Sequence, residues 1–153
     1  MNLTRSGQTN RSNDKCQQVF SWPVRVYWED TDAGGVVYHA RYLNFFERAR
    51  TEMIRATGVD QAELKERHNL IWVVLEMNVK FIKAAKMDDE LLVTAGFEWI
   101  KGVRQGIRQE ITRKRNGEAV ASADVTAVML HADTLKPARM PAWIKEKLDQ
   151  QGF

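Results

Sequence analysis

The sequence predicts an α+β fold in which a curled antiparallel sheet of about five strands wraps around one long central helix. Two observations carry this prediction. Apolar residues recur at helical spacing between residues 42 and 56, and they recur at every second position in four later segments. Because strands joined by short turns must be largely antiparallel, the expected order is strand, long helix, four strands and a short C-terminal helix.

The first strand and the long helix follow from these two periods. Apolar and polar residues alternate from Trp22 to Trp28, and Pro23 near the start of this strand suits an edge position. The apolar stripe that follows predicts an amphipathic helix, which Gly58 ends. Asp60 is expected to cap a shorter helix that runs to about His68.

Four strands are expected in the second half of the chain. They are predicted near residues 71–81, 91–99, 103–111 and 119–129. The breaks between them are the segment KMDDE, Gly102 and the pair Asn116-Gly117, and this pair is a strong signal for a two-residue hairpin turn. A short helix is expected after Pro141.

Composition indicates a single globular domain. The 153 residues are 44% apolar and 28% charged, which is close to an ordinary globular protein. Residues 1–20 are expected to form a flexible polar N-terminal tail, and residues 21–153 a single domain. Since the tail lacks the apolar stretch of a signal peptide and no run of about 18 apolar residues would span a membrane, a cytoplasmic protein without membrane insertion is expected.

Charge and cysteine content exclude several classes of function. The net charge of +3 is weak evidence for an anionic partner, and no basic patch interleaved with aromatic residues predicts nucleic-acid binding. Arg113, Lys114 and Arg115 are interpreted as protection of a sheet edge. Cys16 is the only cysteine, so neither a disulfide nor a cysteine metal cluster is expected within one chain, and no metal-ligand spacing appears elsewhere.

The joint between the first strand and the long helix concentrates residues suited to chemistry. Asp32 and His39 lie seven residues apart across a turn that ends where the helix begins, and Gly34 and Gly35 let a ligand approach the backbone. The first N–H groups of a helix have no partners inside it, so they can polarise a carbonyl oxygen. Taken singly, these residues also have structural interpretations, because aspartates shape turns.

The segment YWEDTDAGGVVYHARYLNFFERARTEMIR resembles the signature of the hotdog-fold acyl-CoA thioesterases, specifically the YbgC-like family encoded with the Tol–Pal cell-envelope genes. The family pattern D-x-D-x-x-G-x-V-Y-H-x-x-Y is matched by Asp30, Asp32, Gly35, Val37, Tyr38, His39 and Tyr42. The resemblance covers roughly residues 22 to 147. It implies the hotdog fold, and it implies that two subunits pair their sheets with active sites at the interface, as a dimer or a dimer of dimers.

The resemblance also implies hydrolysis of an acyl-CoA thioester to the free acid and CoA. Asp32 and His39 are then the catalytic residues, with Asp32 acting either as nucleophile or as general base for water. Helix N-terminal amides, including the His39 N–H, would polarise the carbonyl. The remaining residues expected at the substrate or oxyanion site are Gly35, Val37, Tyr38 and Tyr42.

Coenzyme A is part of this substrate, so no separate cofactor is expected. Basic residues near strand ends are candidates to bind its phosphates, namely Lys80, Lys83, Lys101 and Arg104. Glu47 on the flank of the helix is expected to form an ion pair with a nearby arginine. Trp28 stands where some relatives have a tyrosine, four residues before the catalytic acid.

Two other functions stay open at this point. The chain is also consistent with a non-catalytic protein that binds acyl-CoA or acyl carrier protein in phospholipid or envelope metabolism, or with a hotdog dehydratase. Asp32 favours hydrolysis, because binding alone needs no charged group beside a carbonyl. Neither the acyl chain preference nor the choice between dimer and tetramer follows from the sequence.

Overall fold

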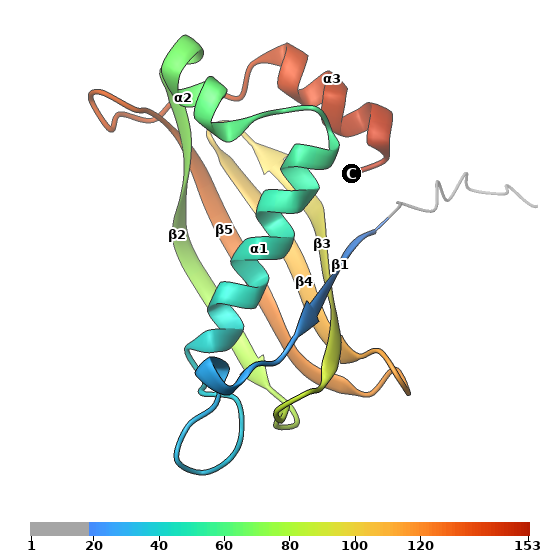
Figure 1. Cartoon of the computed structure of the whole chain (residues 1–153). Helices are drawn as coiled ribbons and strands as arrows, with labels where there is room; N and C mark the ends of the chain where they lie inside the picture. The colour runs from blue at the N-terminus through green and yellow to red at the C-terminus, as the bar shows by residue number, and fades with distance from the viewer. Residues whose placement is uncertain (1–18) are drawn as a thin grey trace, which may run out of the picture.

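The computed structural model describes residues 19–153, which form a five-stranded antiparallel sheet in the order β1-β3-β4-β5-β2 (Figure 1). The elements are β1 (Phe20–Arg25), a 3-10 helix η1 (Trp28–Asp30), α1 (Arg41–Ala56), α2 (Gln61–His68), β2 (Leu70–Phe81), β3 (Glu90–Lys101), β4 (Arg104–Arg113), β5 (Ala119–His131) and α3 (Ala142–Gln151). This order confirms the predicted one. The predicted flexible tail falls almost wholly outside the described residues.

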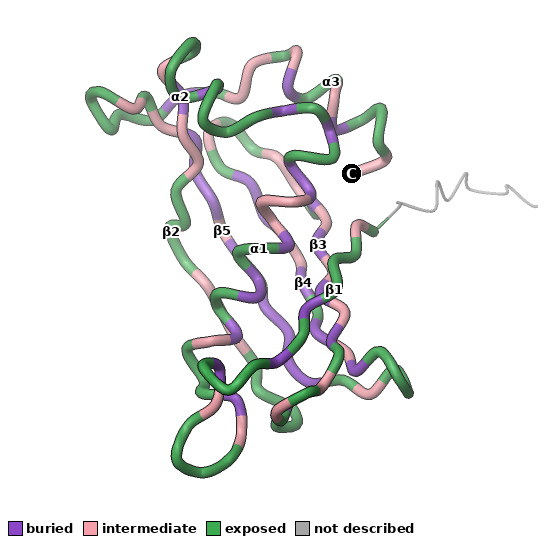
Figure 2. The backbone as a smooth tube through the Cα atoms, in the orientation of Figure 1, coloured by how far each residue is buried: buried purple, intermediate pink, exposed green. Residues whose placement is uncertain are grey.

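Helix α1 crosses one face of the curved sheet, with α2 and α3 at one end of the molecule and the loop that precedes α1 at the other (Figure 1). Its backbone approaches β1 and β3 most closely. Phe45, Phe46, Ala49 and Met53 recur on one side of α1 and are fully buried. Figure 2 shows this buried side together with the buried stretches of the strands behind it. The predicted helical stripe is therefore the centre of the core.

The first strand ends earlier than predicted. Val24 and Val26 are buried as the alternation indicates, but Trp22 is 36% exposed and Trp28 is 76% exposed. Strand β1 stops at Arg25, and Val26 donates its N–H to Asp89 O at 3.0 Å. The prediction of a strand to Trp28 is wrong because η1 turns the chain away from the sheet, whereas the predicted edge position is confirmed.

The structure has the start of α2 and the end of α1 close to where the sequence predicts them. The Asp60 carboxylate accepts from the N–H groups of Ala62 and Glu63 at 2.8 and 3.0 Å, so it caps α2. Helix α1 ends at Ala56, two residues before Gly58, whose φ of +82° suits glycine. The hairpin turn after β4 is longer than the predicted two residues, because Thr112 pairs with Ala119.

Strand β2 contains a bulge that its period-two pattern does not reveal. The register shifts between Val74 and Glu76, so Trp72 lies opposite the buried Met129 while Met77 lies opposite the buried Val125. Cross-strand partners share one face of a sheet. A strict period of two would put Ile71, Val73 and Leu75 on the same face as Met77, but the bulge puts Trp72 there instead, and Leu75 is 54% exposed.

Strand β4 buries two glutamines that the sequence pattern did not indicate. Gln105 and Gln109 are fully buried beside Ile107 and Ile111. The Gln109 side-chain amide donates to the carbonyl oxygen of Phe46 at 3.0 Å, which ties the sheet to α1. Because the amide is hydrogen-bonded, its burial is compatible with a stable core. Among residues 19–153, no helix is long and apolar enough to cross a membrane.

Candidate active site

The loop that joins η1 to α1, residues 31–40, closes on itself and is called the joint loop below. Thr31 and Val37 form an isolated antiparallel bridge across its base. Asp32 N–H donates to Val36 O at 2.9 Å, and Gly35 N–H donates to Asp32 O at 3.0 Å. Gly35 has a φ of +77°, in the left-handed region that glycine adopts without strain. The backbone therefore holds Asp32 at the start of a tight, ordered turn.

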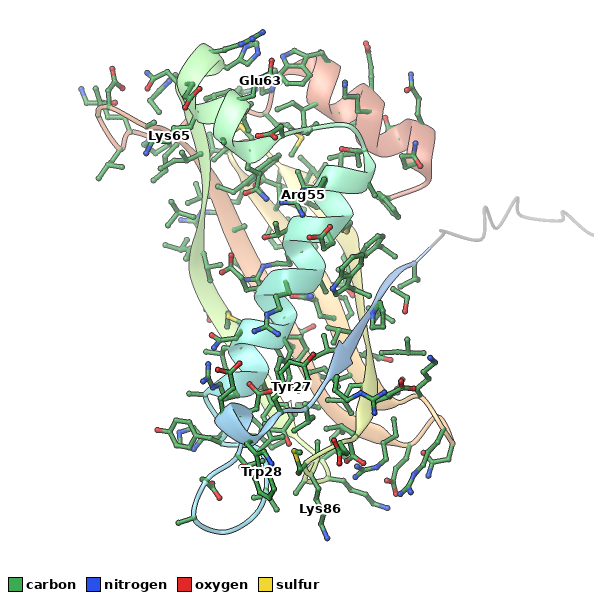
Figure 3. All side chains as sticks on the ribbon, viewed as in Figure 1. Tyr27, Trp28, Arg55, Glu63, Lys65 and Lys86 are labelled. Carbon is green, nitrogen blue, oxygen red and sulfur yellow. The ribbon has the colours of Figure 1, made fainter. Side chains whose placement is uncertain are left out.

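Figure 3 places the joint loop in the molecule. Tyr27 and Trp28 lie at the foot of α1, at the same end as Lys86, whereas Glu63 and Lys65 lie at the opposite end. Tyr27 and Trp28 are 57% and 76% exposed. The joint loop therefore sits at the end of the molecule that α2 and α3 leave uncovered.

The Asp32 carboxylate is exposed and has a single hydrogen-bond donor among the described residues. Gly34 N–H donates to Asp32 Oδ1 at 2.8 Å. A Cβ atom at Gly34 would lie 3.0 Å from this same oxygen, closer than ordinary contacts allow. Gly34 thus orients the carboxylate and leaves room for it, while its second oxygen faces solvent.

Asp30 has the opposite environment. It is 2% exposed, and its Oδ2 accepts from the N–H of Tyr27 at 2.9 Å. Its Oδ1 lies 3.7 Å from Nε of Arg41, in the first turn of α1. Arg41 also donates from NH2 to the carbonyl oxygen of Glu29 at 3.0 Å. Asp30 is therefore bound into the structure that supports the joint loop, and it does not face a ligand.

Helix α1 begins with unused N–H groups at the end of the joint loop that carries Asp32. No side chain caps this end of the helix, and within the described residues no acceptor engages the N–H groups of His39 and Ala40. The N–H groups of Gly35, Val37 and Tyr38 are already bound to Asp32, Ala85 and Asp30. Of the residues predicted to supply donors for an oxyanion, only His39 offers a free N–H.

The side chains of the predicted site fall into two groups. His39 and Tyr38 are exposed, and their ring centroids lie 4.4 Å apart. Val37 and Tyr42 are both 4% exposed, and the Tyr42 hydroxyl accepts from Ala85 N–H at 3.0 Å. Burial raises the pKa of the Tyr42 phenol. Tyr42 is therefore neutral and engaged with the protein, and its predicted contact with substrate is limited to the ring.

A hollow of about 290 Å³ opens beside His39. The residues that line it are Val37, His39, Tyr42, Phe81, Ile82, Lys83 and Ala84. Phe81 and Ile82 are 54% and 53% exposed, and the Phe81 ring centroid lies 5.6 Å from that of Tyr42 and 6.5 Å from that of His39. The walls are mainly apolar, so the hollow suits a hydrocarbon group next to the free N–H groups.

The predicted phosphate-binding residues do not gather at one place. Lys80 and Lys83 lie at the end of β2 that borders this hollow, and Lys83 pairs with Glu118 at 2.5 Å. Lys101 and Arg104 flank the turn at the far end of β3, whose first residue Glu90 pairs with Arg25. Within one chain, the length of β3 separates Lys101 and Arg104 from the joint loop, and the phosphate-binding role of all four residues stays a prediction.

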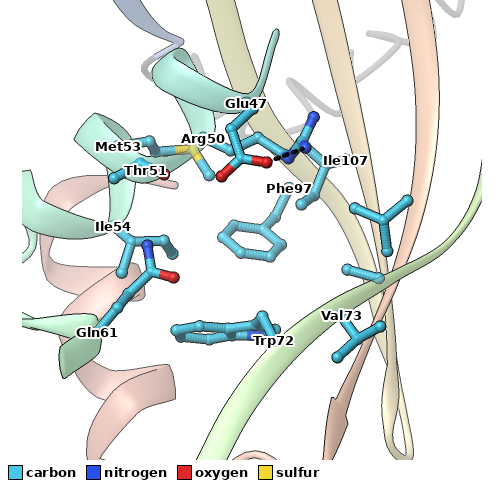
Figure 4. Close-up of a pocket in the computed structure, with 12 residues that line it drawn as sticks. Glu47, Arg50, Thr51, Met53, Ile54, Gln61, Trp72, Val73, Phe97 and Ile107 are labelled. Carbon is cyan, nitrogen blue, oxygen red and sulfur yellow. Dashed lines mark ion pairs between the residues drawn. The ribbon is translucent and has the colours of Figure 1, made fainter. Parts of the chain in front are cut away.

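A second hollow lies between α1 and β2, and sequence reasoning missed most of it (Figure 4). Its walls include the rings of Trp72 and Phe97, and Glu47 lies 3.8 Å from Arg50, as expected for an ion pair with a nearby arginine. Arg50 donates to Gln109 Oε1 at 2.9 Å. Burial lowers the pKa of the Arg50 guanidinium, which the charge of Glu47 partly offsets. Periodicity could not reveal a polar cluster whose partners come from two distant elements.

Relatives of known family match almost the whole chain. Residues 26–148 match the thioesterase-like superfamily. The chain belongs to this superfamily. It is 44% identical to the acyl-CoA thioesterase YbgC of Haemophilus influenzae over 82% of this chain and 91% of that protein. It is 31% identical to the long-chain acyl-CoA thioesterase FadM of Escherichia coli, over 83% of this chain and 95% of that protein.

A solved structure of the family confirms the predicted fold. A probable thioesterase from Bartonella henselae is 34% identical, with a TM-score of 0.76, and the match covers 81% of this chain and 100% of that one. The hotdog fold and the resemblance to YbgC-like thioesterases are therefore confirmed. The family membership joins the joint loop, its exposed carboxylate and the apolar hollow into one candidate active site.

Proposed function

We propose that the protein is an acyl-CoA thioesterase that hydrolyses the thioester to the free acid and CoA at the joint loop. One observation carries the proposal. The free N–H groups at the start of α1 adjoin an apolar hollow that His39 helps to line, and the exposed Asp32 carboxylate lies in the same joint loop, in a chain that belongs to the thioesterase-like superfamily. A carbonyl between an anion and a pair of N–H donors is the arrangement that acyl transfer needs.

The proposed chemistry uses few groups. The N–H groups of His39 and Ala40 donate hydrogen bonds to the carbonyl oxygen of the thioester and stabilise the negative charge that develops on it. Asp32 either removes a proton from the attacking water or attacks the carbonyl carbon itself. The C–S bond then breaks and the CoA thiolate leaves. Because a thiol with a pKa of about 8.5 leaves readily, no general acid is required.

Residues around the joint loop and the apolar hollow are proposed to position the substrate. The apolar wall formed by Val37, Phe81 and Ile82 receives the acyl group next to the thioester. Lys80 and Lys83 at the rim are the proposed contacts for the CoA phosphates, since they lie at the same end of the molecule as Asp32. The exposed imidazole of His39 is proposed to orient the thioester or the carboxylate.

We propose further that the working unit is a homodimer joined through β2. This 12-residue strand lies at the edge of the sheet: one side pairs with β5, the other side has no strand partner in residues 19–153, and Val73, Val74 and Leu75 are exposed. Long apolar edges of this kind pair with another chain. Phe81 of β2 lines one hollow and Trp72 the other, so a second copy would border both hollows. We also propose a dimer of dimers, which would need a further contact in addition to the one through β2.

The test of the activity is thiol release from a panel of acyl-CoAs, from short to long aliphatic chains and benzoyl, with the native protein and Asp32→Asn. The native protein is expected to hydrolyse at least one thioester, and Asp32→Asn to lose at least about 10²-fold in kcat while remaining folded. Asp88→Asn is the matched control, because Asp88 is exposed and its carboxylate has no partner in the described chain. His39→Ala tests the imidazole separately, and full activity would limit the role of His39 to its N–H.

Absence of thiol release by the folded native protein would contradict the proposal. Binding of acyl-CoA or acyl-loaded carrier protein, measured by titration calorimetry, would then support the non-catalytic alternative. The dimer is tested by light scattering, with an expected mass of twice 17.7 kDa. Leu75→Lys should shift the mass toward the monomer, whereas Leu135→Lys, at a loop residue that is 62% exposed, should not.

A further inference from the structure

The loop between β2 and β3, residues 82–89, is held by a buried arginine from another strand. Arg113 at the end of β4 is 8% exposed. Its Nη2 donates to the carbonyl oxygen of Ala84 at 2.8 Å, and its Nε donates to Glu118 Oε2 at 2.8 Å. Its Nη1 forms an ion pair with the Asp89 carboxylate. The interpretation of Arg113 as edge protection is therefore wrong, although Lys114 and Arg115 beside it are exposed.

The residue after Ala84 connects this loop to the candidate active site in two directions. Ala85 is fully buried, and its N–H donates to the Tyr42 hydroxyl in the first turn of α1 at 3.0 Å. Its carbonyl oxygen accepts from Val37 N–H at 2.9 Å. One residue thus binds both the start of α1 and the joint loop.

From Val37 the contacts reach the catalytic carboxylate within one turn. Val37 bridges Thr31, and the neighbouring Val36 O accepts from Asp32 N–H at 2.9 Å. Val37 also lies two residues before His39, whose N–H is free. A shift of Ala85 would therefore move both the carboxylate and the proposed oxyanion donor.

We propose that Arg113 is a positioning residue for the reaction, acting on Asp32 and His39 through Ala84, Ala85, Tyr42 and Val37, which together are called the Arg113 network. This inference rests on the proposed thioesterase activity. Among the described residues that line the apolar hollow, Arg113 is hydrogen-bonded only to Ala84, through its carbonyl oxygen, so its proposed effect is on geometry. Catalytic groups must be held close to their productive positions by surrounding contacts.

The arrangement explains why a charged side chain is buried at this place. An unpaired buried guanidinium is unfavourable, but Arg113 has two carboxylates and a carbonyl oxygen as acceptors. Its hydrogen bond to Glu118 is the main reason that the pKa of Arg113 is raised, so the side chain keeps its charge. The planar guanidinium reaches all three acceptors at once, which a lysine ammonium does not reproduce.

The Arg113 network is tested with three variants and one control. Arg113→Met keeps the length of the chain and removes all donors, while Arg113→Lys keeps the charge but not the planar fork. Tyr42→Phe removes the acceptor for Ala85 N–H and leaves the ring. Arg108→Met is the matched control, because Arg108 lies on the same strand and also pairs with two carboxylates, those of Glu110 and Asp124, without touching the loop.

Thioester hydrolysis under saturating substrate gives the first measurement. We expect Arg113→Met and Tyr42→Phe each to lower kcat by about tenfold or more with little change in KM, because geometry at the reacting carbonyl is affected. The double variant should lose less than the product of the two single losses, since both act on Ala85. Arg108→Met should stay within about twofold of the native kcat.

Hydrogen exchange of single amides gives a measurement that does not depend on activity. In Arg113→Met, the N–H groups of Ala85 and Val37 should exchange faster, while that of Ala49 in the middle of α1 should not. A uniform rise in exchange would show a general loss of stability and would overturn the proposal. If Arg113→Met does not fold, Arg113→Lys takes its place, with a smaller expected loss of kcat and the same local pattern of exchange.

The remaining outcomes separate this inference from the proposed function. A native kcat in Arg113→Met, or an equal loss in Arg108→Met, overturns the positioning role while thioesterase activity stands. If the native protein hydrolyses no thioester, the proposed activity fails, and the positioning role fails with it. Hydrogen exchange at the N–H groups of Ala85 and Val37 would then show only whether Arg113 holds the loop between β2 and β3 in place.

Discussion

Two carboxylates of one short segment, Asp30 in η1 and Asp32 in the joint loop, have opposite environments. Asp30 is 2% exposed and is bound to Tyr27 N–H and to Arg41, whereas Asp32 is exposed and bound only by Gly34 N–H. The residue type is the same, and the two positions are separated only by Thr31. The direction in which the chain turns at Thr31 decides which carboxylate supports the fold and which one faces a ligand.

The difference teaches how the protein keeps a reactive group available without weakening its structure. A buried carboxylate must be satisfied by hydrogen bonds and charges, so it contributes to stability and is unavailable for chemistry. An exposed carboxylate has lone pairs left for water or substrate and contributes little to folding. The same segment therefore carries a supporting acid and a reactive acid.

The largest expected difference between Asp30 and Asp32 is in their contribution to the free energy of unfolding. Asp30→Asn replaces one carboxylate oxygen by an NH₂ group that faces a donor, either Tyr27 N–H or Arg41, so we expect a loss of about 1–3 kcal/mol in the free energy of unfolding. Asp32→Asn should change it by less than about 0.5 kcal/mol. Urea unfolding of both variants measures the difference. Equal losses would show that the two carboxylates share one structural role.

A smaller effect is expected on activity when the reactive carboxylate is displaced. Gly34→Ala puts a Cβ atom 3.0 Å from Asp32 Oδ1, and a shift of this oxygen should lower kcat by about tenfold. Gly96→Ala is the control, because nothing lies within 4 Å of the added Cβ there. Thiol-release rates and melting temperatures of both variants are the measurements. Unchanged kcat in Gly34→Ala would mean that the position of Asp32 does not limit the reaction.

The smallest expected effect is on the pH dependence of stability, and it involves Glu118, a carboxylate outside the joint loop. Hydrogen bonds from Lys83 and Arg113 hold the pKa of Glu118 at about 2, below its ordinary value of 4.5. Its folded-state pKa is depressed, so its contribution to stability is present above about pH 4.5 and is lost as the pH falls toward 2. Glu118→Gln should therefore lower the melting temperature at pH 7 and have little effect near pH 2.

Glu66→Gln is the control for this pH dependence, because Glu66 is exposed and forms no ion pair in the described chain. Its melting temperature should follow that of the native protein from pH 7 to pH 2. A constant difference between Glu118→Gln and the native protein over this range would contradict the shifted pKa. The effect is small because Glu118 remains partly exposed.

Most of the fold could be predicted, and the errors have identifiable causes. The stripe from Tyr42 to Ala56 and the Asp60 cap are local signals, and the structure has α1 and α2 where they indicated. The bulge between Val74 and Glu76 inverts the inward row of β2, and period-two reasoning cannot detect an added residue. Lys101 lies at the opposite end of β3 from the joint loop, a separation that spacing along the chain does not give.

The candidate site was predicted in part. The motif around Asp32 and His39 indicated an acid beside a helix start, and the structure has both residues in the joint loop, with His39 lining an apolar hollow. The sequence did not indicate that the N–H groups of Gly35, Val37 and Tyr38 are already bound to Asp32, Ala85 and Asp30. Nor did it indicate Arg113, because the partners of this side chain lie on segments far apart in the chain.

The sequence by itself determined the class of fold, the order of its elements and the turn that carries the reactive residues. These properties depend on periodicity, capping and glycine, which act over a few neighbouring residues. Only the tertiary structure decided which aspartate is buried, which N–H groups stay free and what holds Ala85 in place. Those outcomes depend on hydrogen bonds between distant segments, such as Arg113 to Ala84 and Tyr42 to Ala85, which exist only after the sheet has curled around α1.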